Sequence, residues 1–265
     1  MGEALVVGLL RSGWAQPEAI VVVEMDDARR AELMARHPGL RVVEDVRESG
    51  FEGDGDAGLR LDGAVIAVKP GDAAAACGSL RAVGARRVLS VAAGVTLAAL
   101  EGWLVEPVPV VRAMPNTAAL VGCGAAAIAG GWAAGTEDLA WAQSILEAVG
   151  TVVVVPESAL DAVTGLSGSG PAYVFLLAEA LIDAGVLVGL ARPVARQLAV
   201  QTLLGSARLL EETGDEPATL RAAVTSPGGT TAAGLRALEA AGVRSAVLEA
   251  VVAATERSRE LGRLG

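Results

Sequence analysis

The stretch GAVIAVKP, residues 63–70, is a continuous apolar run that ends on a lysine and a proline. Such a run is typical of a parallel strand buried on both faces, because helices cover both sides of a parallel sheet. Further β-rich runs precede and follow it, separated by segments of helical length. This alternation predicts an α/β fold with a doubly wound parallel sheet in the first part of the chain.

The first part of the chain alternates between two kinds of pattern. The predicted strands are residues 19–24, 41–43, 63–70, 86–94, 108–115, 124–130 and 151–155. The predicted helices are residues 1–10, which Gly13 would end, and residues 27–37, 72–83, 96–103 and 136–149. Residues 50–63, GFEGDGDAGLRLDG, are rich in Gly and Asp and predict a surface loop.

After Pro156 the β-rich runs stop and only helical patterns follow. Three prolines stand near helix starts, where a missing N–H costs nothing. The predicted helices are residues 171–190, 193–212, 217–224, 231–241 and 243–261. We therefore expect two domains, an α/β domain over 1–155 and an all-helical domain over 156–265.

Composition limits the classes of partner. A formal net charge of −10 argues against nucleic acid and anionic lipid, since both bind basic surfaces. Residues 171–191 are apolar enough to suggest a membrane span, but they contain Glu179 and Asp183. We interpret them as a buried helix in a soluble protein without a secretory signal, and expect a cytoplasmic location. Cys77 and Cys123 are too few for a disulfide framework or a metal site.

Acid–base side chains are scarce. His37 is the only histidine, and Lys69 is the only lysine among 21 basic residues. Lys69 ends a predicted buried strand, at the edge where open α/β sheets bind ligands. Two interpretations stay open, a lysine whose ammonium lies near a cofactor and a solvated loop lysine.

Five segments resemble one enzyme family: AVKP (67–70), AAGV (92–95), VVRAMPNT (110–117), LSGSGPAYVF (166–175) and VTSPGGTTAAGLRALE (224–239). They resemble Δ1-pyrroline-5-carboxylate reductase, the last enzyme of proline biosynthesis, in the family's order over nearly the whole chain. The resemblance implies a Rossmann domain that binds NADPH or NADH, and hydride transfer to the C=N carbon of 1-pyrroline-5-carboxylate. It also implies a homodimer interlocked through the helical domain, and a decamer of dimers.

The stretch TSPGGTT, residues 225–231, is the predicted substrate site. Glycine-flanked backbone N–H groups at a helix start bind anions, and this substrate carries a carboxylate. Gly228 and Gly229 would let the backbone approach, the N–H groups of Gly229 and Thr230 would face the carboxylate, and Ser226 would add a bond. By resemblance, Thr231 would stand near the ring nitrogen. An ordinary turn between two helices is the alternative.

The resemblance also implies a set of cofactor-binding residues. AVKP would contact the cofactor through its backbone, and two further strand ends would line the nicotinamide site. SGSGPAY, residues 167–173, would either touch ligand or only shape the pocket. The implied cofactor-binding residues are Gly2, Glu24, Ala67, Val68, Lys69, Pro70, Ala92, Ala93, Gly94 and Asn116, and the implied catalytic residues are Thr231 and Lys69.

Three features depart from the family pattern. The chain opens at MGEAL, so the first strand and the first two glycines of the dinucleotide fingerprint are absent and only Gly2 is left. We expect that Met1 is an internal methionine of the family pattern and that a central strand precedes it. Glu24 follows the second strand of the family pattern and would repel a 2′-phosphate, which makes NADH plausible; a plain surface residue is the alternative. Val46 stands where relatives carry a cofactor-binding asparagine.

Two rival functions remain. A β-hydroxyacid dehydrogenase shares the predicted plan but needs a lysine in its helical domain, and no lysine follows Lys69. A non-catalytic oligomerising relic with a broken cofactor site is the other. A test of cofactor binding distinguishes these cases, because a relic with a broken cofactor site would not bind the nucleotide.

Overall fold

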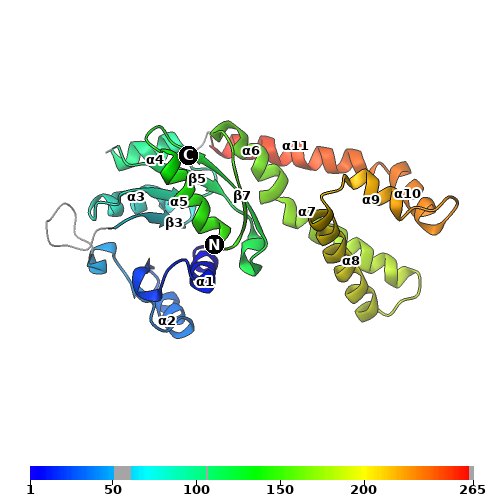
Figure 1. The fold of residues 1–265 in the computed structure, drawn as a ribbon, viewed down its shortest axis with the longest axis horizontal. Helices are drawn as coiled ribbons and strands as arrows, with labels where there is room; N and C mark the ends of the chain where they lie inside the picture. The colour runs from blue at the N-terminus through cyan, green and yellow to red at the C-terminus, as the bar shows by residue number, and fades with distance from the viewer. Residues whose placement is uncertain (51–60, 106, 263–265) are drawn as a thin grey trace. The chain divides into compact units, whose positions relative to one another are not determined.

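The computed structural model describes residues 1–50, 61–105 and 107–262. Contacts divide the chain into two compact units, and Figure 1 shows the elements of each. The first unit comprises Met1–Ser169 with Ala254–Gly265, and the second comprises Gly170–Ala253. The predicted surface loop over residues 50–63 lies largely outside the described residues.

The first unit contains all the strands that the described residues form. Its strands are β1 (Val21–Val23), β2 (Arg41–Val43), β3 (Ala64–Ile66), β4 (Val88–Ser90), β5 (Val110–Met114), β6 (Gly124–Gly130) and β7 (Gly150–Val154). β1 and β2 pair in parallel, and a second sheet has the order β3-β4-β5-β6-β7. Among the described residues, no strand pairs with both β1 and β3. The predicted α/β class and helix-covered sheet are confirmed.

One strand pairing departs from the predicted parallel order. β5 and β6 are antiparallel, with Met114 opposite Ala127. Only the short turn η4 (Thr117–Val121) lies between these strands. A parallel connection needs a crossover of about a dozen residues or more, so this link permits only an antiparallel return.

Helices cover both faces of the five-stranded sheet. They are α1 (Gly2–Ser12), α3 (Ala73–Arg81), α4 (Leu97–Leu104) and α5 (Thr136–Glu147), whereas α2 (Asp27–Arg36) packs on β2 of the two-stranded sheet. Gly13 ends α1 with a φ of 72°, as predicted, and the Thr96 side chain caps α4. Val88 and Leu89 of β4 are fully buried in different core clusters, one with α3 and α4 and the other with α1 and α5. This alternation places one apolar core on each face of the sheet.

The boundary between the units lies after Ser169, later than the predicted boundary after residue 155. The reason is the packing of α6 (Leu160–Val163), whose Leu160 lies in the core cluster with Ile66 and Val88. A single π-helical turn, η6 (Thr164–Gly168), follows α6. The Ser258 hydroxyl donates to the Asp161 carboxylate at 2.7 Å, which ties the end of α11 (Val243–Gly262) to α6.

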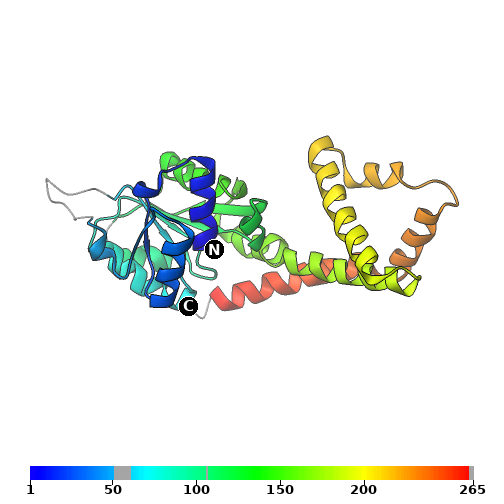
Figure 2. The same ribbon diagram turned by 90° about the horizontal axis from the view of Figure 1, so that it is seen from below.

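The second unit is helical, as predicted. It contains α7 (Gly170–Leu187), α8 (Arg192–Thr213), α9 (Pro217–Ala223), α10 (Thr230–Ala240) and most of α11, which Figure 2 shows from a second direction. The Tyr173 hydroxyl donates to the carbonyl of Ala250 at 3.4 Å, joining α7 to α11. A Cβ on Gly185 would lie 2.9 Å from Ala195, so α7 and α8 approach closely there.

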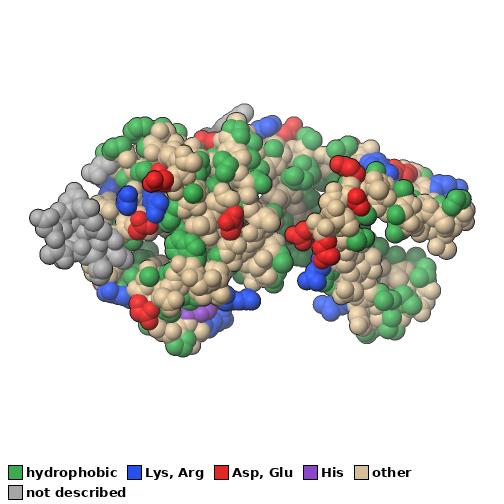
Figure 3. Space-filling view, viewed as in Figure 1, with side chains coloured by type: hydrophobic (Ala, Val, Ile, Leu, Met, Phe, Trp, Pro, Cys, Tyr) green, Lys and Arg blue, Asp and Glu red, His purple; other side chains and the backbone are tan. Residues whose placement is uncertain are grey.

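The prediction that α7 is a buried helix is wrong for a single chain. Among the described residues of α7 none is buried, and Phe175 and Leu176 are 64% and 67% exposed. Hydrophobic side chains are visible over the helices of this unit in Figure 3. Residues Glu157–Leu187 are long and apolar enough to cross a membrane, but length and composition alone are weak grounds for one helix. One chain offers too few helices to cover α7, so its apolar surface is left for another partner.

Candidate active site

Three segments with predicted cofactor residues, 67–70, 92–94 and 116, follow neighbouring strands of the five-stranded sheet. Strands β3, β4 and β5 are parallel, and Ile66, Ser90 and Arg112 stand side by side across them. Their carboxyl ends are therefore level. The segments that follow, 67–70, 92–94 and 115–116, leave the sheet at the edge where open α/β sheets bind their ligands.

The exit of β3 lies beside the start of α1. A Cβ on Gly2 would stand 3.3 Å from the Cβ of Ala67, so the backbone of α1 begins close to this exit. No side chain caps the N-terminus of α1, which leaves its first N–H groups for another acceptor. Lys69 is exposed, and its carbonyl accepts from the N–H of Asp72 at 2.9 Å.

The exit of β4 is a tight turn. Ser90 is fully buried, and its hydroxyl accepts from the N–H of Ala92 at 3.4 Å. Gly94 has a φ of 78°, a conformation that residues with a Cβ rarely adopt. Its carbonyl would lie 3.7 Å from a Cβ on Gly262, so the end of α11 reaches this turn.

The exit of β5 carries a contact that the sequence did not predict. The Asn116 side-chain amide donates to the carbonyl of Ser167 at 3.0 Å, and its oxygen accepts from the N–H of Ala125 at 3.2 Å. Gly168 packs against Met114, since a Cβ there would lie 2.7 Å from the Met114 methyl. The Asn116 side chain thus joins β5, β6 and η6 and does not extend toward solvent.

An ion pair between a buried arginine and a partly exposed glutamate supports the same edge. Arg112, 8% exposed, donates to the carboxylate of Glu157 at 2.9 Å. The same carboxylate oxygen accepts from the N–H of Leu97, at the start of α4, at 2.7 Å. Sequence reasoning missed this pair, although an arginine inside the apolar run VVRAM indicates that a buried partner is needed.

The exit of β1 carries the predicted ribose contact, Glu24. Its side chain is half-buried and accepts from the N–H of Asp26 at 3.1 Å. Val46, which stands where relatives carry a cofactor-binding asparagine, is buried at the start of η2 (Val46–Ser49).

Glu3, in the first turn of α1, is the most perturbed acid near this exit. Partial burial would raise the pKa of its carboxyl, but hydrogen bonds with His37, Arg29 and Arg36 lower that pKa to about 2. Glu3 is therefore charged at neutral pH and ties α1 to α2.

The loop 225–231 lies in the helical unit and joins α9 to α10. Gly228 has a φ of 70°. A Cβ on Gly229 would lie 2.3 Å from the Ser226 hydroxyl, so a larger residue there would displace the Ser226 side chain. One expected donor is already used, because the N–H of Gly229 donates to the carbonyl of Ser226 at 3.1 Å. This bond closes the turn and corrects the prediction that the Gly229 N–H faces a ligand.

The other features of the loop suit an anion. α10 begins at Thr230 without a side-chain cap, so N–H groups of its first turn are left for a ligand. Ser226 is exposed, and Thr231 is half-buried in that turn. The Thr225 hydroxyl instead donates to the carbonyl of Arg221 at 2.6 Å, which ties the start of the loop to α9.

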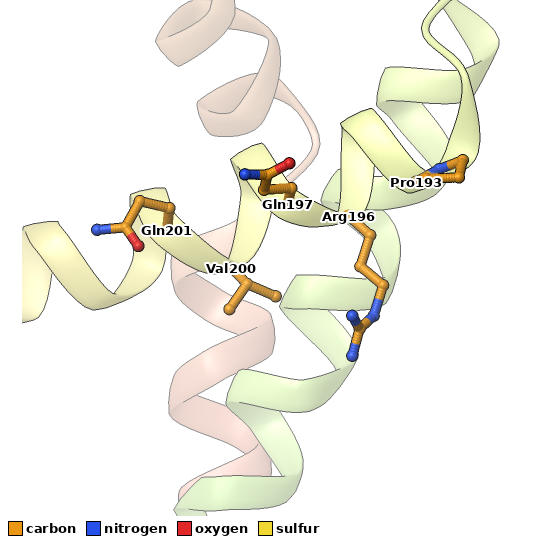
Figure 4. Close-up of a pocket in the computed structure, with 5 residues that line it drawn as sticks. All are labelled: Pro193, Arg196, Gln197, Val200 and Gln201. Atoms are coloured by element: carbon orange, nitrogen blue, oxygen red, sulfur yellow. The ribbon is translucent and has the colours of Figure 1, made fainter.

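Other parts of the described structure offer fewer groups that could bind or react with a ligand. Figure 4 shows a hollow beside α8 lined by Pro193, Arg196, Gln197, Val200 and Gln201, none of which was predicted as a site residue. Within the described ranges, no group of three His, Cys, Asp or Glu side chains could hold a metal ion. Burial raises the pKa of the Cys77 thiol, so this cysteine is not activated.

Comparison with known proteins identifies relatives over nearly the whole chain. Residues 157–261 match the family model described as pyrroline-5-carboxylate reductase dimerisation, which starts close to the predicted domain boundary. The chain is 46% identical over 265 residues to a pyrroline-5-carboxylate reductase of a Synechocystis species, covering 99% of this chain and 95% of the relative.

Two solved structures are also similar. One is a pyrroline-5-carboxylate reductase of Coxiella burnetii, with a TM-score of 0.88 and 35% identity over 98% of this chain and 94% of that one. The other is the pyrroline carboxylate reductase of Plasmodium falciparum with NADP bound, with a TM-score of 0.82 and 29% identity over 99% of this chain and 94% of that one.

Proposed function

This chain belongs to the pyrroline-5-carboxylate reductase family, and we propose which of its residues carry out the reaction. It is an oxidoreductase that reduces 1-pyrroline-5-carboxylate to L-proline, the last step of proline biosynthesis, with NADPH or NADH. When bound, the nicotinamide supplies the hydride that reaches the C=N carbon. The neighbouring function of a β-hydroxyacid dehydrogenase and that of a non-catalytic relic are not favoured by these relatives.

The proposed cofactor site is the carboxyl edge of the sheet. The bare backbone at Gly2 and the uncapped start of α1 suit the pyrophosphate. The backbone of Ala67–Pro70 and the turn Ala92–Gly94 would line the nicotinamide, with the Lys69 ammonium near it. Asn116 would contribute through the position of its backbone, because its side chain is bonded to Ser167 and Ala125.

The proposed substrate site is the loop from Ser226 to Thr231. The main support for this assignment is that α10 begins there without a side-chain cap. The uncapped N-terminus of α10 would hold the carboxylate through the N–H of Thr230 and its neighbours. The Ser226 hydroxyl would add a bond. Gly228 and Gly229 would leave room for the ring.

The scarcity of acid–base side chains suits this substrate. Reduction of a ketone builds negative charge on oxygen and usually needs a placed general acid. A cyclic imine takes its proton from water before reduction, so the protein mainly orients the ring and excludes water. We assign to Thr231 a hydrogen bond from its hydroxyl to the ring nitrogen.

The helical unit would join two subunits. The exposed apolar surface of α7 and the match to a dimerisation family support a homodimer through this unit. We extend this to a decamer of dimers in the cytoplasm, with neither nucleic acid nor membrane as a partner. The net charge of −10 argues against nucleic acid and anionic lipid as partners.

The test is a direct assay of the purified protein. Oxidation of NADH or NADPH should depend on 1-pyrroline-5-carboxylate, and proline should accumulate in equal amount. Thr231→Ala should slow turnover about tenfold or more, while the control Thr202→Ala, whose hydroxyl only bonds the Leu198 carbonyl in α8, should not. Turnover of 3-hydroxyisobutyrate or 6-phosphogluconate without turnover of the imine would overturn the proposal.

A further inference from the structure

The loop after β1 presents carboxylates where the adenosine ribose of a dinucleotide lies in this fold class. Glu24 bends back to accept the N–H of Asp26 at 3.1 Å. Asp26 caps α2, accepting the N–H of Arg29 at 2.7 Å. Asp27 follows in the first turn with its side chain 91% exposed. A carboxylate therefore already occupies the N-terminus of α2, a position that would otherwise stabilise a bound phosphate.

The two arginines nearest to this loop are already engaged. Arg30 donates to the carbonyls of Glu24 and Met25 at 2.8 and 2.9 Å, and pairs with Asp27 and Glu44. Its side chain is only 14% exposed, so it supports the loop from beneath. Arg29 pairs with Glu3 and Glu32 and points toward α1.

The remaining arginines of this region also have protein acceptors. Arg36 pairs with Glu3 and Glu32, Arg41 donates to the carbonyl of Glu48, and Arg47 pairs with Asp45. In the described residues up to Gly50, every arginine beyond β1 is thus bonded to a carboxylate or a carbonyl. A 2′-phosphate would meet carboxylates and would have to break an existing ion pair to gain a cation.

The loop is also held in place relative to α1. Glu3 in the first turn of α1 bonds Arg29 in the first turn of α2 and Arg36 near its end, the latter at 3.0 Å. The start of α1, proposed here for the pyrophosphate, and the carboxylates after β1 therefore belong to one braced substructure. A rearrangement that moves the acidic loop away from the ribose would break this network.

Resting on the proposed function, we propose that this enzyme is specific for NADH, and that Glu24 and Asp26 together exclude NADPH. Glu24 accepts hydrogen bonds from the ribose hydroxyls of NADH. Asp26 adds a second negative charge and blocks the helix N-terminus that would stabilise a 2′-phosphate. These two residues determine cofactor specificity and take no part in hydride transfer.

The test compares the binding of NADH and NADPH to the 265-residue protein by calorimetry and thermal shift, without substrate. At low ionic strength we expect NADH to bind at least about tenfold more tightly than NADPH. Because the discrimination is electrostatic, the ratio should narrow as ionic strength rises. Equal or tighter binding of NADPH overturns this inference alone, whereas binding of neither nucleotide overturns the proposed function as well.

Two variants separate charge from structure. Glu24→Gln keeps an oxygen for the Asp26 N–H, and Asp26→Ser keeps a helix cap, so both should fold. The double variant should bind NADPH about tenfold more tightly or better, with a smaller loss of NADH affinity. The control Glu147→Gln removes an exposed charge on α5 and should leave the ratio unchanged. An unchanged ratio in the double variant overturns the assignment.

Discussion

The side-chain amide of Asn116 donates a hydrogen bond to the carbonyl of Ser167 at 3.0 Å, across 51 positions of sequence. Its oxygen accepts from Ala125 at 3.2 Å. One side chain therefore fixes the end of β5, the start of β6 and the π-helical turn η6. Single π-helical turns recur at functional sites, and this one lies directly before the helical unit.

Replacing Asn116 by Leu should destabilise the protein and impair catalysis. The change leaves the Ser167 carbonyl and the Ala125 N–H without their partner, which costs about 1–3 kcal/mol for a buried group. Urea unfolding measures the loss of stability, and kcat/KM measures the effect on the site. Gln143→Ala on the exposed face of α5 is the control. Unchanged stability in Asn116→Leu would show that this contact contributes nothing.

The loop before α10 should be more sensitive to a larger side chain at Gly229 than at Gly228. Gly229→Ala puts a Cβ 2.3 Å from the Ser226 hydroxyl, which must move, so we expect KM for the imine to rise about tenfold or more. Gly228→Ala meets no atom within 4 Å and suffers only the strain of a positive φ, about 1 kcal/mol. Steady-state kinetics measure KM for the imine in both variants, at equal concentrations of folded protein. Equal KM values in the two variants would contradict a role for the loop geometry.

Glu3 should make stability depend on pH in the acid range. Its folded pKa of about 2 lies below the ordinary value of 4.5. A lowered folded pKa means that the stabilisation is complete above the unfolded pKa and is lost as pH falls through the folded one. Between about pH 4.5 and pH 2 the protein should therefore lose the contribution of Glu3.

Glu3→Gln tests this directly. At pH 7 the variant should be less stable by about 1–3 kcal/mol, a range that water at the partly exposed site reduces. The difference from the unaltered protein should shrink as pH falls toward 2. The measurement is the melting temperature of Glu3→Gln and of the unaltered protein across this pH range, with Glu147→Gln as control. A difference that stays constant with pH would contradict the linkage.

Features that depend on neighbouring residues, such as helix ends, were predicted from the sequence. Gly13 and Thr96 end and begin their helices as expected, because caps depend on neighbouring backbone groups. The antiparallel return of β6 and the Asn116 contact were missed, because both depend on partners far along the chain. A loop before a helix start was predicted at Gly228 and Gly229, with a turn as the alternative, but the hydrogen bond of the Gly229 N–H within the turn was not, since the sequence does not show which acceptor a donor finds.

The exposure of α7 was missed for a different reason. An apolar helix looks the same in sequence whether its own chain or a second copy buries it. Val174 and Leu181 are 49% and 41% exposed in one chain, which is costly for a helix of this composition. The exposed apolar surface of α7 therefore fits contact with another subunit, in agreement with the match to the dimerisation family model.

Phe175→Asp should accordingly weaken the dimer. Phe175 is 64% exposed in the single chain, and an interface aromatic of this kind often contributes about 2 kcal/mol or more, equivalent to roughly a thirty-fold rise in the dimer Kd. Sedimentation velocity over a dilution series measures this constant. Trp132→Asp, which changes a residue that is 74% exposed in the first unit, is the matched control and should leave the dimer intact. If both variants dissociate at the same concentration as the unaltered protein, the surface of α7 is not the interface; if only Phe175→Asp dissociates, the helical unit joins the subunits.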